Sequence, residues 1–154
     1  MSEKKPWHGV IVATALPFTE DYAVDYDAFA DHVAWLAANG CDGVAPNGSL
    51  GEYQTLSDVE RAQVITTAVE AAPAGFHVMA GTGAYGALQS AHWAEQAANA
   101  GATSVMQLPP NTYRADWEIV KDHYATVASV GLPVVGYNNP IDTKVDLVPE
   151  LIAE

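Results

Sequence analysis

The sequence predicts an α/β protein in which a parallel sheet is covered by helices. Five short apolar runs are each followed by a segment whose apolar residues recur at helical spacing. The runs end near residues 16, 47, 81, 108 and 138, about 30 residues apart, so one strand and one helix alternate five times. Strands that are apolar throughout and alternate with amphipathic helices are typical of parallel sheets.

The strands are expected where runs rich in β-branched residues stand between turn residues. Leu16-Pro17 ends the first run, and Pro109-Pro110 ends the fourth. Asn138-Asn139-Pro140 closes the fifth. The expected strands are residues 9–15, 43–45, 76–80, 103–108 and 133–137.

The helices are expected from their capping residues and from the apolar spacing that follows them. Asp25 can cap the first helix, which Gly40 stops. Ser57 and Glu60 form the pattern of a capping box at the start of the second. Asp116 begins the fourth. The five helices are expected to begin near residues 25, 57, 87, 116 and 146.

Two architectures fit this order of elements. One is an open doubly wound sheet, which is complete in five strands. The other is the first five units of a (β/α)8 barrel, which typically needs about 250 residues. The chain stops inside the expected fifth helix with no final strand after it, which favours an incomplete TIM barrel. Residues 1–154 contain no linker, so we expect a single domain.

Composition narrows the classes of partner. Of the 154 residues, 49% are hydrophobic and 16% are charged, as in globular proteins. The net charge of −13 argues against nucleic acid or an anionic membrane as a partner, because both attract Lys and Arg. Cys41 is the only cysteine, and residues 1–6 lack the apolar core of a signal peptide. These features predict a cytoplasmic protein.

The loop Pro46 to Glu52 is the first candidate binding site. Gly48 and Gly51 flank Ser49 and Leu50 where the second strand gives way to a loop. Glycines let the backbone approach a ligand closely. Successive backbone N–H groups together with the Ser49 hydroxyl can hold an anion such as a carboxylate. Taken alone, the loop is also compatible with an ordinary turn.

A second glycine-rich segment, Gly81 to Gly86, matches the dinucleotide-binding pattern G-x-G-x-x-G. That pattern needs an acidic residue at the end of the next strand to hold the ribose, and the strand ending at Leu108 supplies none. The interpretation as a glycine turn is therefore preferred. The five histidines show no metal-ligand spacing, so neither a metal nor a cofactor is expected.

Tyr137 is the candidate catalytic residue. It ends the fifth apolar run, at the position where a barrel places its catalytic groups. A tyrosine in a desolvated pocket can pass protons during carbonyl chemistry when a hydroxyl relay connects it to water. Its position is equally compatible with a core tyrosine.

With these residues assembled, the chain resembles the dihydrodipicolinate synthase / N-acetylneuraminate lyase family, which are class I aldolases on (β/α)8 barrels. The resemblance runs from Gly9 to Leu151 and covers the front part of the family's domain. Its markers are Val12-Ala13-Thr14 with Pro17-Phe18, Gly48-Ser49-Leu50-Gly51-Glu52, Ala80-Gly81-Thr82-Gly83, Pro109-Pro110 and Tyr137-Asn138-Asn139-Pro140.

The resemblance implies a role for each candidate residue. Ser49 and the backbone around Leu50 and Gly51 would hold the carboxylate of pyruvate or a related 2-keto acid. Tyr137 would relay protons to and from a Schiff base that the substrate forms with a lysine. The reaction would make or break a C–C bond. Family members usually form dimers or tetramers, so the resemblance also implies a homo-oligomer.

The sequence departs from the family in four places. Leu50 replaces the second hydroxyl residue of the loop, and Asn111-Thr112-Tyr113 stands where some members carry relay tyrosines. Ile141-Asp142 stands where the synthases have an arginine, which disfavours dihydrodipicolinate synthase activity and favours a less anionic aldehyde or a sugar-acid or aromatic substrate. The family's lysine lies one unit beyond Tyr137, where this chain has ended. Lys144 follows the fifth strand, but Asp142 and Asp146 flank it.

These departures leave the catalytic status of the chain open. We expect a segment of a lyase-type aldolase that is inactive alone because it lacks the imine-forming lysine. One alternative is a non-catalytic half-barrel that binds small acids or assembles with a partner. Another is a compact nucleotide-binding domain that uses Gly81 to Gly86.

Overall fold

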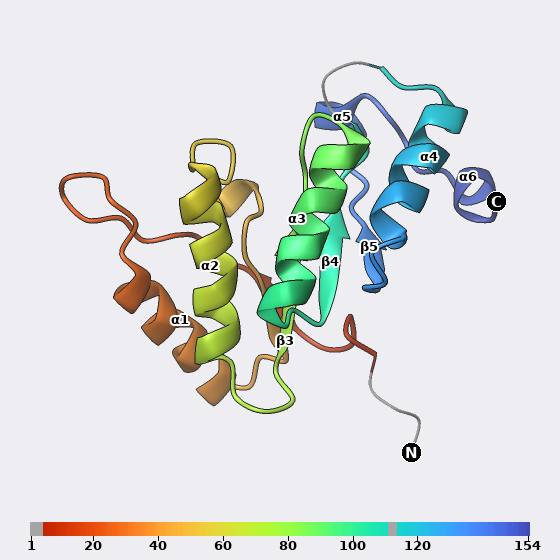
Figure 1. Ribbon diagram of the computed structural model, residues 1–154. Helices are drawn as coiled ribbons and strands as arrows, with labels where there is room; N and C mark the ends of the chain where they lie inside the picture. The colour runs from red at the N-terminus through yellow and green to blue at the C-terminus, as the bar shows by residue number, and fades with distance from the viewer. Residues whose placement is uncertain (1–4, 111–113) are drawn as a thin grey trace.

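The computed structural model describes residues 5–110 and 114–154 and contains one parallel sheet of five strands in the order β1-β2-β3-β4-β5 (Figure 1). Each neighbouring pair is parallel. β1, β4 and β5 are shorter than the apolar runs that predict them, because the ends of those runs lie in the connecting loops, whereas β2 and β3 have the expected lengths. Their bounds are β1 Ile11–Ala13, β2 Gly43–Ala45, β3 His77–Gly81, β4 Ser104–Gln107 and β5 Val134–Gly136.

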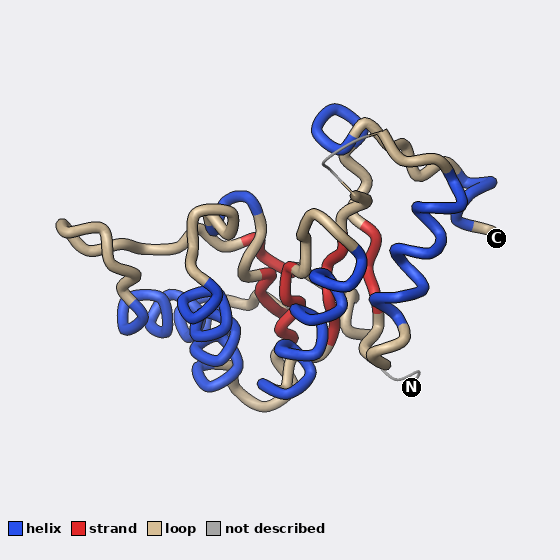
Figure 2. The backbone as a smooth tube through the Cα atoms, turned by 45° about the horizontal axis from the view of Figure 1, so that its top comes forward, coloured by secondary structure: helices blue, strands red, loops and turns tan. Residues whose placement is uncertain are grey.

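Four long helices connect the strands, and they follow an arc around the sheet (Figure 2). They are α1 Tyr26–Ala38, α2 Asp58–Ala71, α3 Ala87–Ala100 and α4 Trp117–Ala128. Each packs against the next one along the chain. Three short elements complete the described part: the 3₁₀ turn η1 Ser49–Gly51, α5 Pro140–Thr143 and α6 Pro149–Ile152. No helix among the described residues is long and apolar enough to cross a membrane.

The capping residues expected from the sequence are confirmed. The Asp25 carboxylate accepts a hydrogen bond from the N–H of Ala28 at 2.9 Å. Ser57 and Glu60 form both bonds of the capping box at the start of α2. The Asp116 carboxylate accepts from the N–H of Ile119 at 3.0 Å. These side chains satisfy N–H groups that a helix cannot satisfy internally, which explains why local sequence suffices to predict the helix starts.

The order of the strands decides between the two expected architectures. A doubly wound sheet reverses its strand order at one point, which places helices on both of its faces. Here every strand follows its predecessor in the same direction. Because β-α-β crossovers are right-handed, this uniform order brings all the connecting helices to one side. The fold is therefore the N-terminal part of a (β/α)8 barrel, as expected from the sequence.

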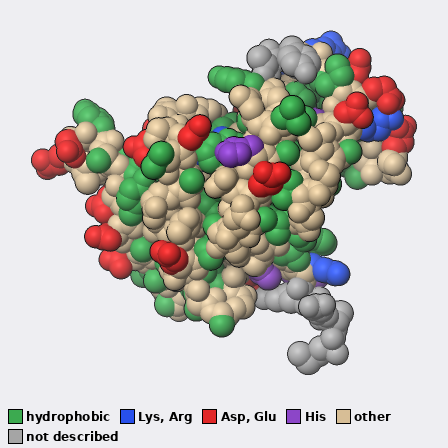
Figure 3. All heavy atoms as spheres, in the orientation of Figure 1, with side chains coloured by type: hydrophobic (Ala, Val, Ile, Leu, Met, Phe, Trp, Pro, Cys, Tyr) green, Lys and Arg blue, Asp and Glu red, His purple; other side chains and the backbone are tan. Residues whose placement is uncertain are grey.

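The main core lies between that side of the sheet and the helices. Alternate strand residues point into it, which is the two-residue period of a strand. The contributing strand residues are Val12, Val44, Val78, Ala80, Val105 and Val134. Phe29, Val33, Ile65, Ala68, Ala94, Ala97 and Val127 meet them from the helices. Acidic side chains, by contrast, gather on the outer face of α1 (Figure 3), where Asp27 and Asp31 are exposed.

The segment after β5 differs from expectation. Asn138-Asn139-Pro140 was predicted only to close the strand, but Pro140 is the first residue of α5. Proline is favoured at that position because its fixed φ suits a helix and its missing N–H is not needed there. The last helix begins at Pro149 and not near Asp146. Val145 lies in the intervening segment and packs with Val120 and Leu151 in a second, smaller core.

Candidate functional site

The candidate site lies at the edge of the sheet where the carboxyl ends of the strands meet. In a barrel, the loops at this edge carry the functional groups. The loop after β2 contains Ser49, and Tyr137 directly follows β5. The parallel sheet therefore brings both sequence-predicted residues to the same edge, with β3 and β4 between their strands.

The loop after β2 is a single 3₁₀ turn. The N–H of Gly51 donates to the carbonyl oxygen of Gly48 at 3.0 Å, and the N–H of Glu52 donates to that of Ser49 at 3.1 Å. The first N–H groups of such a turn have no partner inside it. These are the N–H groups of Ser49 and Leu50, whose side chains are both exposed. Ser49 and Leu50 thus offer the donors, whereas the N–H of Gly51 holds the turn together.

Asn47 fixes the approach to this turn. Its backbone has a φ of +57°, a left-handed conformation that asparagine tolerates better than most residues. Its Nδ2 donates to the carbonyl oxygen of Arg61 at 2.9 Å, which ties the loop to α2. On the other side it lies against β3, where a Cβ on Gly81 would come within 2.1 Å of the Asn47 carbonyl oxygen. Gly81 is therefore required for the loop to lie this close to β3.

Arg61 is a buried cation beneath these loops. Its Nη2 lies 3.2 Å from the carbonyl oxygen of Gly81 and 2.9 Å from that of Gly83, and it donates to both. Its guanidinium lies 4.8 Å from the ring centroid of Tyr53 and 4.2 Å from that of Trp93, which are cation–π distances. Burial lowers the pKa of Arg61 to about 10, so it stays charged at neutral pH.

The sequence analysis missed Arg61, although a signal for it exists. It stands three, four and seven residues before Val64, Ile65 and Ala68, which form the buried face of α2. A charged residue in an apolar face needs partners, because an unpaired buried charge is costly. The sequence could have shown that this arginine is unusual. Its partners lie at and just after the end of β3, on α3 and in the loop after η1, and they are visible only in the folded chain.

Gln107 is the centre of a second buried polar cluster, between β4 and the helices α3 and α4. Its Oε1 accepts from the hydroxyl of Thr82 at 2.6 Å, and its Nε2 donates to the carbonyl oxygen of Leu108 at 2.7 Å. The same Nε2 lies 3.3 Å from Oγ of Ser90 and 2.8 Å from Nε2 of His123. His123 Nε2 also lies 3.1 Å from the Leu108 carbonyl oxygen, so this ring nitrogen contacts both an amide and a carbonyl group.

Burial of His123 predicts a loss of stability in acid. Desolvation lowers the pKa of His123 below its ordinary value near 6.5, although the nearby Leu108 carbonyl acts in the opposite direction. The unfolded chain therefore takes up the proton first as the pH falls. The contribution of His123 is fully present above pH ~6.5 and is lost as the pH falls from there through the folded-state pKa.

Urea denaturation at pH 7.5 and pH 5.5 tests this prediction. We expect the wild-type chain to lose more stability between the two pH values than His123→Gln, whose amide does not titrate. The other four histidines are common to both proteins, so their contributions cancel in the comparison. Equal losses of stability in the two proteins would show that protonation of His123 does not cause the loss in acid.

Tyr137 is held through its backbone. Its N–H donates to the carbonyl oxygen of Gln107 at 2.9 Å, and the Tyr124 hydroxyl donates to the same oxygen, also at 2.9 Å. The Tyr137 side chain is 44% exposed in the described part of the chain. The Gln107 cluster thus anchors the strand end from which Tyr137 projects.

Lys144 is exposed at the end of α5. Its Nζ donates to the carbonyl oxygen of Ile141, three residues earlier. Asp142 accepts from Nδ2 of Asn139, and Asp146 accepts from Nδ2 of Asn138 at 2.8 Å. The two carboxylates that flank Lys144 in sequence therefore hold the loop amides. Asn111, Thr112 and Tyr113, which we considered as relay residues, lie outside the described residues.

The segment Gly81 to Gly86 has a packing explanation. Gly81 contacts the loop after β2, and a Cβ on Gly83 would come within 3.0 Å of the Tyr53 hydroxyl. The carbonyl oxygens of both glycines accept from Arg61. Among residues 5–110 and 114–154, no cluster of His, Cys, Asp and Glu side chains is suited to hold a metal ion.

Comparisons with known proteins agree with the resemblance drawn from the sequence. Residues 6–154 match the model of the Dihydrodipicolinate synthetase family. An "uncharacterized DapA-like lyase" of Rhizobium meliloti is 36% identical over 154 residues, which is all of this chain and 51% of the relative. The chain thus spans about half the length of the curated relatives it matches.

Solved structures give the same result for the fold. A dihydrodipicolinate synthase from Aquifex aeolicus superposes with a TM-score of 0.88 at 31% identity, over 94% of this chain and 49% of that one. YagE from Escherichia coli K12, solved in complex with pyruvate, gives 0.89 at 28% identity, over 95% of this chain and 49% of that one. The resemblance drawn from the sequence is confirmed, and the chain belongs to the dihydrodipicolinate synthetase family.

Proposed function

We propose that this chain carries the keto-acid-binding loop and the proton relay of a Schiff-base aldolase that acts on pyruvate or a related 2-keto acid. The observation that carries the proposal is the exposure of Ser49 and Tyr137 at the same edge of a parallel sheet. Membership of the family supports it. So does the pyruvate complex of YagE, a protein that shares this fold.

Ser49 and the amides beside it are suited to a carboxylate. The hydroxyl of Ser49 and the N–H groups of Ser49 and Leu50 would donate three hydrogen bonds to the two carboxylate oxygens. Hydrogen bonds to a charged acceptor are roughly twice as strong as neutral ones. Because Leu50 carries no hydroxyl and its side chain is 65% exposed, Ser49 would be the only side-chain donor of this loop.

Tyr137 would relay protons to and from the Schiff base that the substrate forms. Its exposed side chain projects from the end of β5, while its backbone is fixed on Gln107. A phenol hydroxyl both donates and accepts, so it can pass a proton between the substrate and water. The chain thereby supplies binding and proton transfer, whereas the electron sink of the reaction is an imine on a lysine.

The described lysines do not fit the role of imine former. The hydrogen bonds that Lys121 donates to the carboxylates of Glu118 and Glu154 raise the pKa of Lys121, which holds its amine protonated. Lys144 is exposed and bound to a backbone carbonyl, and Lys5 is exposed near the N-terminus. An imine-forming lysine needs burial or a neighbouring cation to lower its pKa. We therefore expect this chain alone to form no imine.

Pyruvate binding tests the proposed site directly. In ¹H–¹⁵N NMR titrations, we expect millimolar pyruvate to shift the amide signals of Ser49 and Leu50. Ser49→Ala should weaken this binding about tenfold, because one charge-assisted hydrogen bond is lost. Ser129→Ala, at the end of α4, is the matched control and should bind as the wild type does. Unchanged pyruvate binding by Ser49→Ala would contradict the proposed role of this loop.

Borohydride trapping tests whether this chain alone forms an imine with pyruvate. Reduction in the presence of pyruvate, followed by mass spectrometry, should show no adduct on this chain. An adduct on Lys144 would contradict the expectation and make the chain a complete Schiff-base catalyst. Self-association, which the family resemblance implies, stays a prediction that sedimentation velocity would check.

A further inference from the structure

We infer that the loop after β2 contains a latent modification site, Asn47–Gly48, which the fold protects from spontaneous deamidation while the loop is closed. The sequence contains two Asn-Gly pairs, Asn39–Gly40 and Asn47–Gly48. Loss of the amide at Asn47 would loosen the loop that carries Ser49. The inference goes beyond the proposed function, because it depends on the geometry of the loop and not on keto-acid chemistry.

The chemistry of an Asn-Gly pair makes both positions candidates for this modification. The backbone nitrogen of the glycine attacks Cγ of the asparagine, which forms an N–C bond and a cyclic imide. The side-chain nitrogen leaves as ammonia, together with the proton of the glycine N–H. Water then hydrolyses the imide at one of its two carbonyl groups, and the product is aspartate or isoaspartate. Glycine favours the first step because it has no Cβ and its backbone adopts many conformations.

Three contacts hold Asn47 away from this reaction. Its Nδ2 donates to the carbonyl oxygen of Arg61 at 2.9 Å, which fixes the side chain on α2. Its backbone carbonyl oxygen lies against β3, where a Cβ on Gly81 would come within 2.1 Å of it. The preceding carbonyl oxygen, that of Pro46, accepts from the N–H of Gly81 at 2.8 Å. Ring closure turns the side chain and the following peptide toward each other, so these contacts must first break.

Burial also keeps the second reactant, water, away from Asn47. This residue is 2% exposed, so water reaches the imide only after the loop has moved. Local openings of a folded chain occur with free energies far below that of global unfolding. We therefore expect Asn47 to react from an open form of the loop, at a rate proportional to the population of that form.

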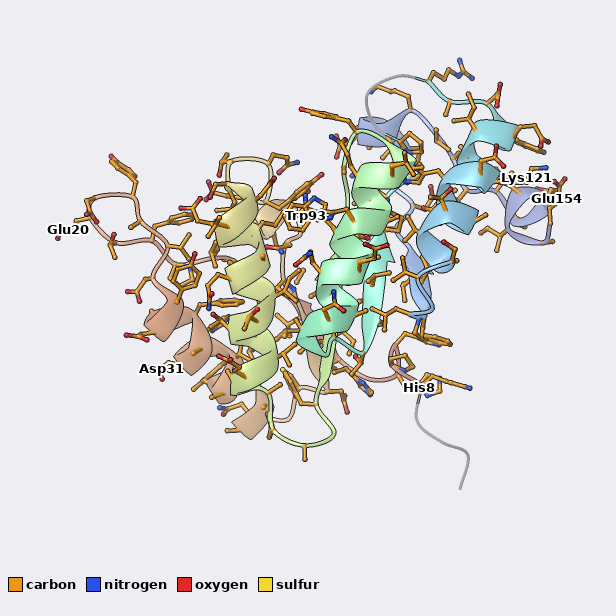
Figure 4. All side chains as sticks on the ribbon, viewed as in Figure 1. His8, Glu20, Asp31, Trp93, Lys121 and Glu154 are labelled. Carbon is orange, nitrogen blue, oxygen red and sulfur yellow. The ribbon has the colours of Figure 1, made fainter. Side chains whose placement is uncertain are left out.

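The other pair, Asn39–Gly40, lies in the opposite environment. Asn39 stands at the C-terminal end of α1, the helix whose outer side carries the exposed Asp31 (Figure 4). Asn39 and Gly40 are both exposed. Nδ2 of Asn39 donates to the carbonyl oxygen of Trp35 at 2.8 Å, but this bond is exposed and lies in the last turn of the helix, where helices fray. The same dipeptide thus provides an internal reference that the fold does not enclose.

Conversion of Asn47 would loosen the loop irreversibly. A carboxylate has no N–H, so repulsion between two oxygens would replace the hydrogen bond to the carbonyl group of Arg61. Oδ1 of Asn47 is buried and already has no partner among the described residues. A charge at this buried position would be costly. Because Asn47 stands two positions before Ser49, we expect the modified loop to displace the Ser49 side chain.

Peptide mapping of the aged protein tests the inference. The chain is incubated in mildly alkaline buffer, and mass spectrometry follows the deamidated fraction of each Asn-Gly pair over time. We expect Asn39 to convert first and Asn47 to convert about a hundredfold more slowly, because only the open loop reacts. In urea above the unfolding midpoint, the two pairs should react at similar rates.

Gly81→Ala separates opening of the loop from other causes. The added Cβ would displace the loop from β3, so we expect Asn47 to convert about tenfold faster than in the wild type and Asn39 to keep its rate. Gly136→Ala is the matched control, because a Cβ there makes only ordinary contact, and it should change neither rate. Circular dichroism checks that both variants are folded. If Gly81→Ala does not fold, wild type in urea below the midpoint replaces it, and only the rate of Asn47 should rise with urea.

Equal rates for the two pairs in the folded wild-type chain would overturn the inference. A folded Gly81→Ala in which Asn47 reacts as slowly as in the wild type would do the same. The consequence for the loop has its own measurement: Asn47→Asp should lower the urea midpoint clearly, and Asn39→Asp much less. A midpoint of Asn47→Asp equal to that of the wild type would show that the amide does not hold the loop. Pyruvate is absent from these measurements, so a failed modification site and a failed keto-acid site are distinguishable.

Discussion

Replacing Arg61 by methionine is expected to destabilise the chain by about 2–4 kcal/mol, since two charge-assisted hydrogen bonds and the cation–π contacts are lost. The carbonyl oxygens of Gly81 and Gly83 would remain buried without this donor. Methionine fills a similar volume between Tyr53 and Trp93, so the change isolates the charge from the packing. The shift of the urea midpoint measures the effect.

Arg114→Met is the matched control, because Arg114 is exposed and the chemical change is the same. We expect its urea midpoint to equal that of the wild type. A gain in stability for Arg61→Met is the opposite outcome, and it has a physical basis because burying a charge is itself costly. If methionine raised the stability, the desolvation of the guanidinium would outweigh its contacts. Arg61 would then be present for the geometry of the loops and not for stability.

Replacing Gly81 by alanine is the second large effect that we expect. The added Cβ would lie 2.1 Å from the carbonyl oxygen of Asn47 and 3.1 Å from that of Pro46. Both neighbours are backbone atoms, so no rotation of a side chain relieves the overlap. We expect a destabilisation of about 2–4 kcal/mol, at the upper end of overpacking effects. A urea midpoint within error of the wild type would refute the close approach of this loop to β3.

Gly136→Ala provides the control in another strand of the same sheet. A Cβ on Gly136 would meet its nearest neighbour, Leu147, at 3.5 Å, which is ordinary contact. Alanine should therefore leave the stability unchanged or raise it by about 0.5–1 kcal/mol through the unfolded chain. In Gly81→Ala, the loop displaced from β3 is the one that holds Ser49. Pyruvate titration of this variant should thus show weaker binding than that of Gly136→Ala.

Arg61→Met and Gly81→Ala probe the same set of contacts. The loop after β2 is tied to α2 through Asn47, and α2 is tied to the end of β3 through Arg61. The exposed Ser49 therefore stands on buried polar contacts rather than on a free surface loop. The Gln107 cluster does the same for Tyr137 at the other end of the site. Both candidate residues therefore lie at strand ends that buried polar contacts hold in place.

The sequence by itself determined the elements and their order. Helix starts at Asp25, Ser57 and Asp116 follow from side chains that bond to N–H groups within three residues. The strands follow from short apolar runs, and the loops with Ser49 and Tyr137 follow the second and fifth of them. These features depend on neighbours in the chain, so a linear pattern records them. The start of α5 at Pro140 was missed because Asn-Asn-Pro also fits a simple turn.

Only the tertiary structure decided how these elements combine. The uniform strand order excluded the doubly wound sheet, which apolar periodicity alone had left open. The carbonyl groups that accept from Arg61 stand 20 and 22 residues from it along the chain. The side-chain partners of Gln107 come from two helices and from the loop after β3. Such contacts depend on which strands pair and on which side the helices cross. A buried charge or amide in the sequence shows that partners are needed, and only the folded chain identifies them.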